Sequence, residues 1–115
     1  MIREKVYNGL DNEITLGLLI DGSEWSPAAL TRVVLSLQND DGDAATVIDS
    51  ATATAGSMTW DQQATVLDNI VEVLVLKLGG ESIPARDDYT GTLTLYDATF
   101  PNGKVWDDKI SLEVI

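Results

Sequence analysis

The chain has 115 residues, of which 44% are hydrophobic, enough for one domain with its own core. Its 19 acidic and seven basic residues give a net charge of −12, so contact with a nucleic-acid backbone or an anionic membrane surface would be repulsive. Cys and His are absent, which removes disulfides, thiolate zinc sites and the usual general base. We therefore expect a single non-enzymatic domain over residues 1–115, with no cofactor, no direct nucleic-acid contact and no membrane contact.

The N-terminal third predicts two strands. The first ten residues lack the apolar stretch of a signal peptide, which favours synthesis in the cytoplasm. From Glu13 to Ile20, apolar side chains occupy alternate positions, as in a strand with one buried face. Ser26 and Pro27 suit the start of one helical turn reaching Leu30, and Thr31 to Gln38 alternates again.

The middle of the chain predicts shorter elements. A turn covers residues 39–43, a short strand follows at Thr46 to Ile48, and small polar residues from Ala51 to Ser57 indicate a loop. Ser57 to Trp60 is expected to pair briefly before a turn at Asp61 to Ala64.

Ile70 to Leu78 differs because both of its faces are apolar. Such a strand is either central in its sheet or covered by something outside the domain. The segments available to cover the face of Val71, Val73 and Val75 are thin. We therefore expect these three valines to lie at or near a partner-binding contact, with a further copy of the chain or with a larger protein.

The C-terminal third gives the clearest fold signal. Tyr89 opens an alternating run that ends at Asp97, and in immunoglobulin-like domains a tyrosine at this place ties its hydroxyl to upstream backbone. Asn102-Gly103 predicts a hairpin turn leading to a final strand at Lys109 to Ile115, antiparallel to the strand of Tyr89. Strands at roughly ten-residue spacing predict an all-β fold, a single immunoglobulin-like antiparallel β-sandwich.

Twelve inward-facing positions are expected to form one core: Ile14, Leu16, Leu18, Val33, Leu35, Leu37, Leu74, Leu76, Leu93, Leu95, Ile110 and Leu112.

Two candidate ligand sites remain. Asn39, Asp41 and Asp43 are weak calcium candidates, but their spacing does not fit an EF-hand and a solvated turn is the simpler interpretation. Trp25, Trp60 and Trp106 would stack on a sugar if all three were exposed on one face, although packing on the rim of the core is commoner for such residues. The adjacent carboxylates at residues 87–88 and 107–108 are poorly placed for joint acid–base chemistry, because neighbours in a strand point to opposite faces.

Three segments together resemble a set of short tailed-phage proteins, small β-sandwiches counted among virion structural proteins. The segments are Leu18-Leu19-Ile20-Asp21-Gly22 running on to Ala29-Leu30-Thr31-Arg32-Val33, then Met58-Thr59-Trp60, then Tyr89 to Trp106, of which Tyr96 to Trp106 is the most specific part. The resemblance implies a structural role and brings no catalytic residues.

On this basis we expect a virion structural protein, oligomeric in the particle, that binds copies of itself or other virion proteins. It would act as a capsid decoration (cement) module or as a tail accessory. A carbohydrate- or receptor-binding module is the alternative, and an all-carboxylate hydrolase is a remote third.

Overall fold

The computed structural model describes residues 2–17, 19–20, 23–24, 29–40, 42, 45–53, 56–66, 68–81, 83–84 and 87–115. These residues form ten strands and no α-helix: β1 (Ile2–Val6), β2 (Ile14–Leu16), β3 (Leu19–Ile20), β4 (Ser23–Glu24), β5 (Arg32–Asn39), β6 (Ala45–Asp49), β7 (Met58–Val66), β8 (Asn69–Leu76), β9 (Asp87–Tyr96) and β10 (Lys104–Val114). The expected all-β class is confirmed. Within the described ranges, no helix has the length and apolar character needed to cross a membrane.

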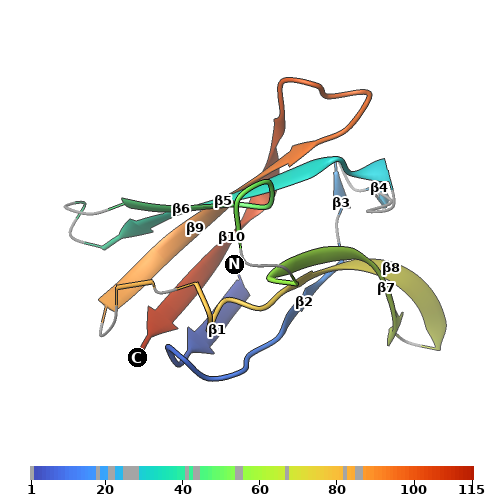
Figure 1. The fold of residues 1–115 in the computed structure, drawn as a ribbon. Helices are drawn as coiled ribbons and strands as arrows, with labels where there is room; N and C mark the ends of the chain where they lie inside the picture. The colour runs from blue at the N-terminus through green and yellow to red at the C-terminus, as the bar shows by residue number, and fades with distance from the viewer. Residues whose placement is uncertain are drawn as a thin grey trace.

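The strands form three sheets (Figure 1). A five-stranded sheet has the order β1-β10-β9-β5-β6, a three-stranded sheet has the order β2-β8-β7, and β3 and β4 make a small hairpin. The two larger sheets lie one above the other, with β2, β7 and β8 beneath β5, β9 and β10 in the view of Figure 1.

One pairing corrects the expected purely antiparallel arrangement, because β1 runs parallel to β10. β1 contributes the buried Val6 and the partly buried Ile2 to the core, while Arg3, Glu4 and Lys5 are exposed. Because apolar and polar residues do not alternate in this segment, the sequence did not predict a strand there. The segment becomes a strand by pairing with the free edge of β10.

The core lies between the two larger sheets and matches the expected set. Eleven of the twelve expected residues are buried in one apolar cluster, and Leu18 lies outside the described residues. The cluster combines Leu16, Leu74 and Leu76 from the three-stranded sheet with residues such as Leu35 and Leu93 from the five-stranded sheet. The two sheets therefore share one core.

The corner at Tyr89 is as the sequence predicts. Tyr89 is 1% exposed, and its hydroxyl donates a hydrogen bond of 2.9 Å to the carbonyl of Pro84. Leu112 in β10 lies opposite Tyr89 in the antiparallel β9–β10 pair, and the Gly103 amide closes the connecting turn on the Phe100 carbonyl at 3.0 Å. The expected late hairpin is confirmed.

Three elements differ from expectation. β7 extends to Val66 through the expected turn at Asp61 to Ala64, because a register shift between Thr59 and Gln62 lets this polar edge strand keep pairing with β8. The strand expected from Glu13 to Ile20 is divided, since β2 ends at Leu16 and β3 pairs with β4 instead. The expected helical turn lies mostly outside the described residues.

Candidate interaction surface

The outer face of the five-stranded sheet is the side turned away from the core. β9 shows the alternation most clearly: Tyr89, Gly91, Leu93 and Leu95 are buried, whereas Thr90, Thr92 and Thr94 between them are partly exposed. The same alternation runs through β5, where Ser36 and Gln38 are exposed between buried neighbours. Period-two geometry therefore places these polar side chains together on one surface.

Strand register arranges the middle of this surface as a grid of nine residues, which we call the threonine face. Each threonine of β9 has one neighbour on β5 and one on β10, and the three rows are Gln38–Thr90–Ser111, Ser36–Thr92–Lys109 and Val34–Thr94–Val105. No residue of the threonine face is a carboxylate, and Lys109 carries its only charge. Asp107 and Asp108 lie in β10 between Val105 and Lys109, where the β9–β10 register shifts, so two acidic residues interrupt the β10 row of the face. The nine paired residues themselves carry one charge, in a chain with 19 acidic residues among 115, which reduces repulsion of another protein.

An ion pair borders the threonine face on the side of β5 and β6. Arg32 Nε donates to Asp49 Oδ1 at 2.9 Å, and Arg32 Nη2 bonds the second carboxylate oxygen. The hydrogen bond from Arg32, helped by one from the Ala51 amide, lowers the pKa of Asp49 to about 2. The Arg32 guanidinium also lies 4.9 Å from the centre of the Tyr96 ring, within the range of a cation–π contact. The paired charges of Arg32 and Asp49 leave this border without net charge.

The opposite border mixes both signs. Arg3 and Lys5 of β1 pair in register with Ser111 and Glu113 of β10, and Glu113 in turn pairs with Asp88. With Glu4, these residues line an open depression of about 510 Å³. Val47 and Val105, which are 63% and 55% exposed, add apolar area to the face as a whole.

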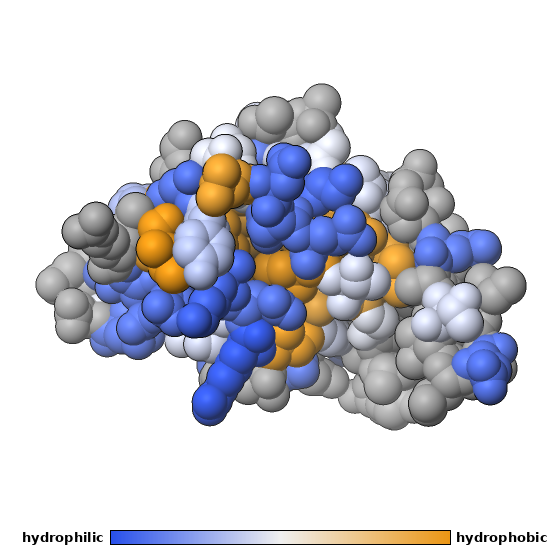
Figure 2. Space-filling view, turned by 90° about the horizontal axis from the view of Figure 1, so that it is seen from below, coloured by the Kyte–Doolittle hydropathy of each residue, from blue (hydrophilic) through white to orange (hydrophobic). Residues whose placement is uncertain are grey.

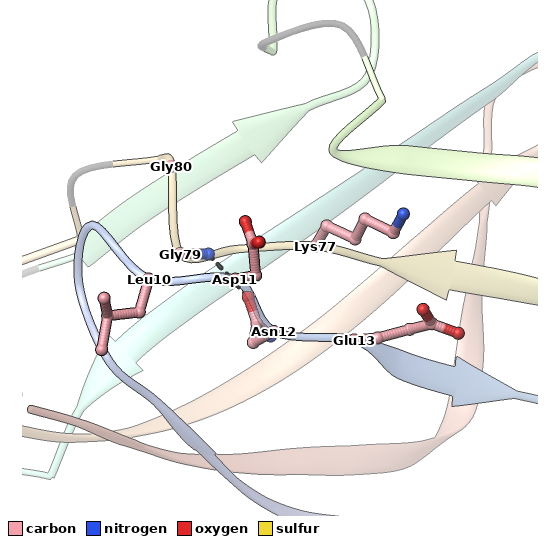
Figure 3. A pocket seen from close by; sticks show the side chains of 7 residues that line it. All are labelled: Leu10, Asp11, Asn12, Glu13, Lys77, Gly79 and Gly80. Atoms are coloured by element: carbon pink, nitrogen blue, oxygen red, sulfur yellow. Dashed lines mark hydrogen bonds between the residues drawn. The ribbon is translucent and has the colours of Figure 1, made fainter.

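A second groove lies where the segment Leu10 to Glu13 runs beside Lys77, Gly79 and Gly80 (Figure 3). Its volume is about 500 Å³. Asn12 builds it, because its Oδ1 accepts hydrogen bonds of 2.7 Å from the amides of both Leu78 and Gly79. Figure 3 shows the charged ends of Asp11, Glu13 and Lys77 pointing in different directions, so they form no converging catalytic pair.

Close packing explains why that groove is rigid. A Cβ atom on Gly79 would lie 1.8 Å from the Leu10 carbonyl oxygen, so only glycine fits there. The Asn8 side chain adds a hydrogen bond of 2.5 Å to the Ile83 carbonyl. We interpret this end of the molecule as a structural anchor for the loop between β1 and β2.

The structure buries the valines that the sequence assigned to a partner contact. Val73 and Val75 are 2% and 5% exposed within the single chain, and the side chain of Val71 lies outside what the structure describes. β8 is the central strand of its sheet, which is one of the two expected explanations for its apolar faces. A contact at these valines stays a prediction, and Val73 and Val75 offer almost no exposed area for it.

Of the three weak calcium candidates, Asn39 alone lies within the described residues. Asn39 is 7% exposed, and its Nδ2 donates to Asp87 Oδ2 at 3.2 Å, so this side chain is engaged in holding β5 to β9. Asp41 and Asp43 lie outside the described residues. Among the residues that are described, no three carboxylates, histidines or cysteines gather as a metal site would require.

The tryptophans do not form a common exposed face in the part described. Trp106 is 6% exposed and belongs to the core cluster, and Trp60 packs against that cluster. Both positions favour the packing interpretation over sugar stacking. Trp25 lies outside the described residues.

Among the described residues in the view of Figure 2, hydrophilic side chains surround smaller apolar areas. Tyr7 and Leu10, which are 46% and 62% exposed, lie in the loop after β1. The sequence shows that Thr90, Thr92 and Thr94 alternate with apolar residues. It does not show which residues of β5 and β10 lie beside them, because that depends on the strand order.

No protein-family model matches this chain, and no curated protein matches it.

Proposed function

We propose that this chain is a non-enzymatic structural protein of a tailed-phage virion, which acts by protein–protein binding as a capsid decoration (cement) module or a tail accessory. One observation carries the binding role: the threonine face consists of nine paired residues on three adjacent strands that carry a single charge, in a chain of net charge −12, although Asp107 and Asp108 lie in the β10 bulge between two of them. Depletion of charged residues is what distinguishes the centre of a protein interface from the rest of a protein surface. The virion setting rests on the resemblance of the segment Tyr96 to Trp106 and its companions.

The fold we propose for this role is a single immunoglobulin-like β-sandwich. The shared core of the two larger sheets supports it, and so does the hydrogen bond from Tyr89 to the Pro84 carbonyl, five residues upstream. The parallel strand β1 is an addition to that pattern at the sheet edge. The late strands β9 and β10 then form the centre of the binding sheet.

The carbohydrate-binding alternative loses its main support at Trp106. A sugar ring needs an open aromatic face to stack on, and a side chain that is 6% exposed offers none. We therefore propose protein binding alone.

The test of the virion role is direct. Particles of the source phage are purified by density gradient, and the chain is quantified by mass spectrometry against the major capsid protein. We expect many copies per particle for a decoration module and a few for a tail accessory. Absence of the chain from intact, infectious particles would overturn the proposal.

A further inference from the structure

We propose that Asn102, at the tip of the β9–β10 hairpin, is a site of spontaneous deamidation, a covalent modification that turns its neutral side-chain amide into a carboxylate. This chemistry is independent of the proposed binding role. Its evidence is a contrast between the two Asn-Gly pairs of the chain, Asn8-Gly9 and Asn102-Gly103, which the fold holds in different ways.

Deamidation at an Asn-Gly pair is a reaction of the chain with itself, and water is its co-reactant. The backbone nitrogen of the glycine attacks Cγ of the asparagine, so that a C–N bond forms, and the side-chain nitrogen leaves as ammonia with the proton of the attacking nitrogen. Water then opens the cyclic succinimide at either of its carbonyl groups, which gives aspartate or isoaspartate. Glycine favours the attack because it has no Cβ to hinder its nitrogen and adopts many backbone conformations.

The two glycines share one backbone conformation. Gly9 and Gly103 have positive φ angles of 78° and 87°, in the left-handed region that favours glycine. The residue pair and the glycine conformation are therefore alike at the two sites. A difference in reactivity comes from what holds each asparagine in place.

Asn8 is half-buried and tied to segments that are distant in the sequence. Its backbone N–H donates to the Ile115 carbonyl at 3.1 Å, and its Nδ2 donates to the Ile83 carbonyl at 2.5 Å. The Gly9 amide, which is the attacking group, donates to the Gly79 carbonyl at 2.7 Å. Bringing the Gly9 nitrogen onto Cγ of Asn8 breaks at least the last two of these bonds, so the fold protects this asparagine.

Asn102 has no comparable anchor. Its side chain is exposed, and none of the described residues forms a hydrogen bond with it. Thr99 and Pro101 are exposed as well, and Figure 1 shows the loop between β9 and β10 projecting at the top of the view, away from the three-stranded sheet. The Gly103 amide donates to the Phe100 carbonyl at 3.0 Å, but this bond lies within the turn itself and can open while the core stays closed.

The modification changes the turn in two ways. Each deamidated copy gains a negative charge two positions before Lys104, in a chain whose net charge is already −12. The isoaspartate product also lengthens the backbone next to Gly103, where a Cβ atom would lie 2.7 Å from Thr94 Cγ2 and 2.8 Å from the Tyr96 ring. There is no room for this longer backbone without a shift, so the isoaspartate form disturbs the packing of the hairpin tip.

The experiment ages the full chain at mildly alkaline pH and physiological temperature, once folded and once unfolded in guanidinium chloride. Trypsin then releases the peptide Val6 to Arg32, which contains Asn8, and the peptide Asp87 to Lys104, in which Asn102 is the only asparagine. Mass spectrometry with fragmentation quantifies deamidation at each asparagine. Asn102→Gln is the matched variant, because the longer side chain of glutamine forms its cyclic imide far more slowly, and a thermal melt checks its folding.

The unfolded sample gives the intrinsic ratio of the two deamidation rates. In the folded chain we expect this ratio to move at least about tenfold in favour of Asn102, since two hydrogen bonds to distant segments protect Asn8 alone. Asn102→Gln should leave the hairpin peptide unmodified. A ratio that is the same in the folded and unfolded chain, a ratio that moves in favour of Asn8, or an Asn102 that stays unmodified in the folded chain overturns the proposal.

Discussion

Replacing Tyr89 with Phe tests whether the corner before β9 stabilises the fold through its hydrogen bond. The substitution keeps the aromatic ring in its buried position and removes only the hydroxyl, which donates to the Pro84 carbonyl at 2.9 Å. Pro84 is exposed, so water can satisfy its carbonyl once the hydroxyl is gone. The expected cost is therefore that of one net hydrogen bond, about 1 kcal/mol in the free energy of unfolding.

Chemical denaturation followed by tryptophan fluorescence measures this cost, and a thermal melt should show a fall of roughly 3–6 °C for a domain of this size. Tyr89→Ala is the matched comparison, because it also removes the ring from the core and should cost about 3–5 kcal/mol. Equal stabilities of Tyr89→Phe and the parent, or equal losses for the two variants, would refute the reasoning.

The same residue has a spectroscopic signature. Burial, and to a smaller degree the charge of Asp87, raises the pKa of the Tyr89 hydroxyl above its usual value of 10.0. An ultraviolet titration of the three tyrosines in the folded chain should therefore show a late component that is lost in Tyr89→Phe. Because the folded-state pKa is raised, its contribution to stability is complete below pH 10 and is lost as the pH rises towards the folded value.

Three further outcomes are expected. Leu93→Ala should cost about 2–4 kcal/mol in denaturant unfolding, because Leu93 is fully buried in the shared core; a loss below 1 kcal/mol would mean that the core is not packed there. The pKa of Asp49, about 2, lies below its usual 3.8, so its ion pair should add less than about 1 kcal/mol to the free energy of unfolding above pH 4. This contribution should be lost as the pH falls towards 2. The free energy of unfolding of Asp49→Asn should therefore change less with pH over that range than that of the parent chain. Val73→Asp should unfold the monomer, since it buries a charge at a site that is 2% exposed; a folded variant whose assembly is lost would instead restore the partner contact first expected at Val73.

Much of the fold was predictable because alternation in β5, β9 and β10 directly encodes which side chains face the core. Leu35, Leu93 and Ile110 each sit at an alternate apolar position and each is buried. The segments that were mispredicted lack this signal. β1 is buried at Val6 and partly at Ile2, and the polar run in β7 is an edge strand that pairs only with β8. Pairing with a neighbour distant in sequence, rather than local pattern, makes these segments strands.

The candidate site was less predictable for a related reason. Sequence alternation shows that Thr92 faces away from the core, but the residues beside it belong to strands more than fifteen positions away in the chain, at Ser36 and Lys109. The threonine face can be assembled only once the order β10-β9-β5 is known. At Val73, apolar residues on both faces predicted an external partner, and the structure buries that side chain within the chain, so the contact stays a prediction.

Burial of Val73 and Val75 within one chain also constrains how assembly proceeds. A core that is closed without a partner means that folding and association are separate steps, so the free energy of unfolding should not depend on protein concentration through the core. Any contact must then use surface that is already hydrated in the free chain, and its affinity comes from shape and charge rather than from completing a core. The threonine face meets that condition, since its side chains are partly or fully exposed and their backbone is already paired in the sheet. Association through it should be reversible and should leave the fold of the chain unchanged, which is what the proposed role as a subunit added to a particle requires.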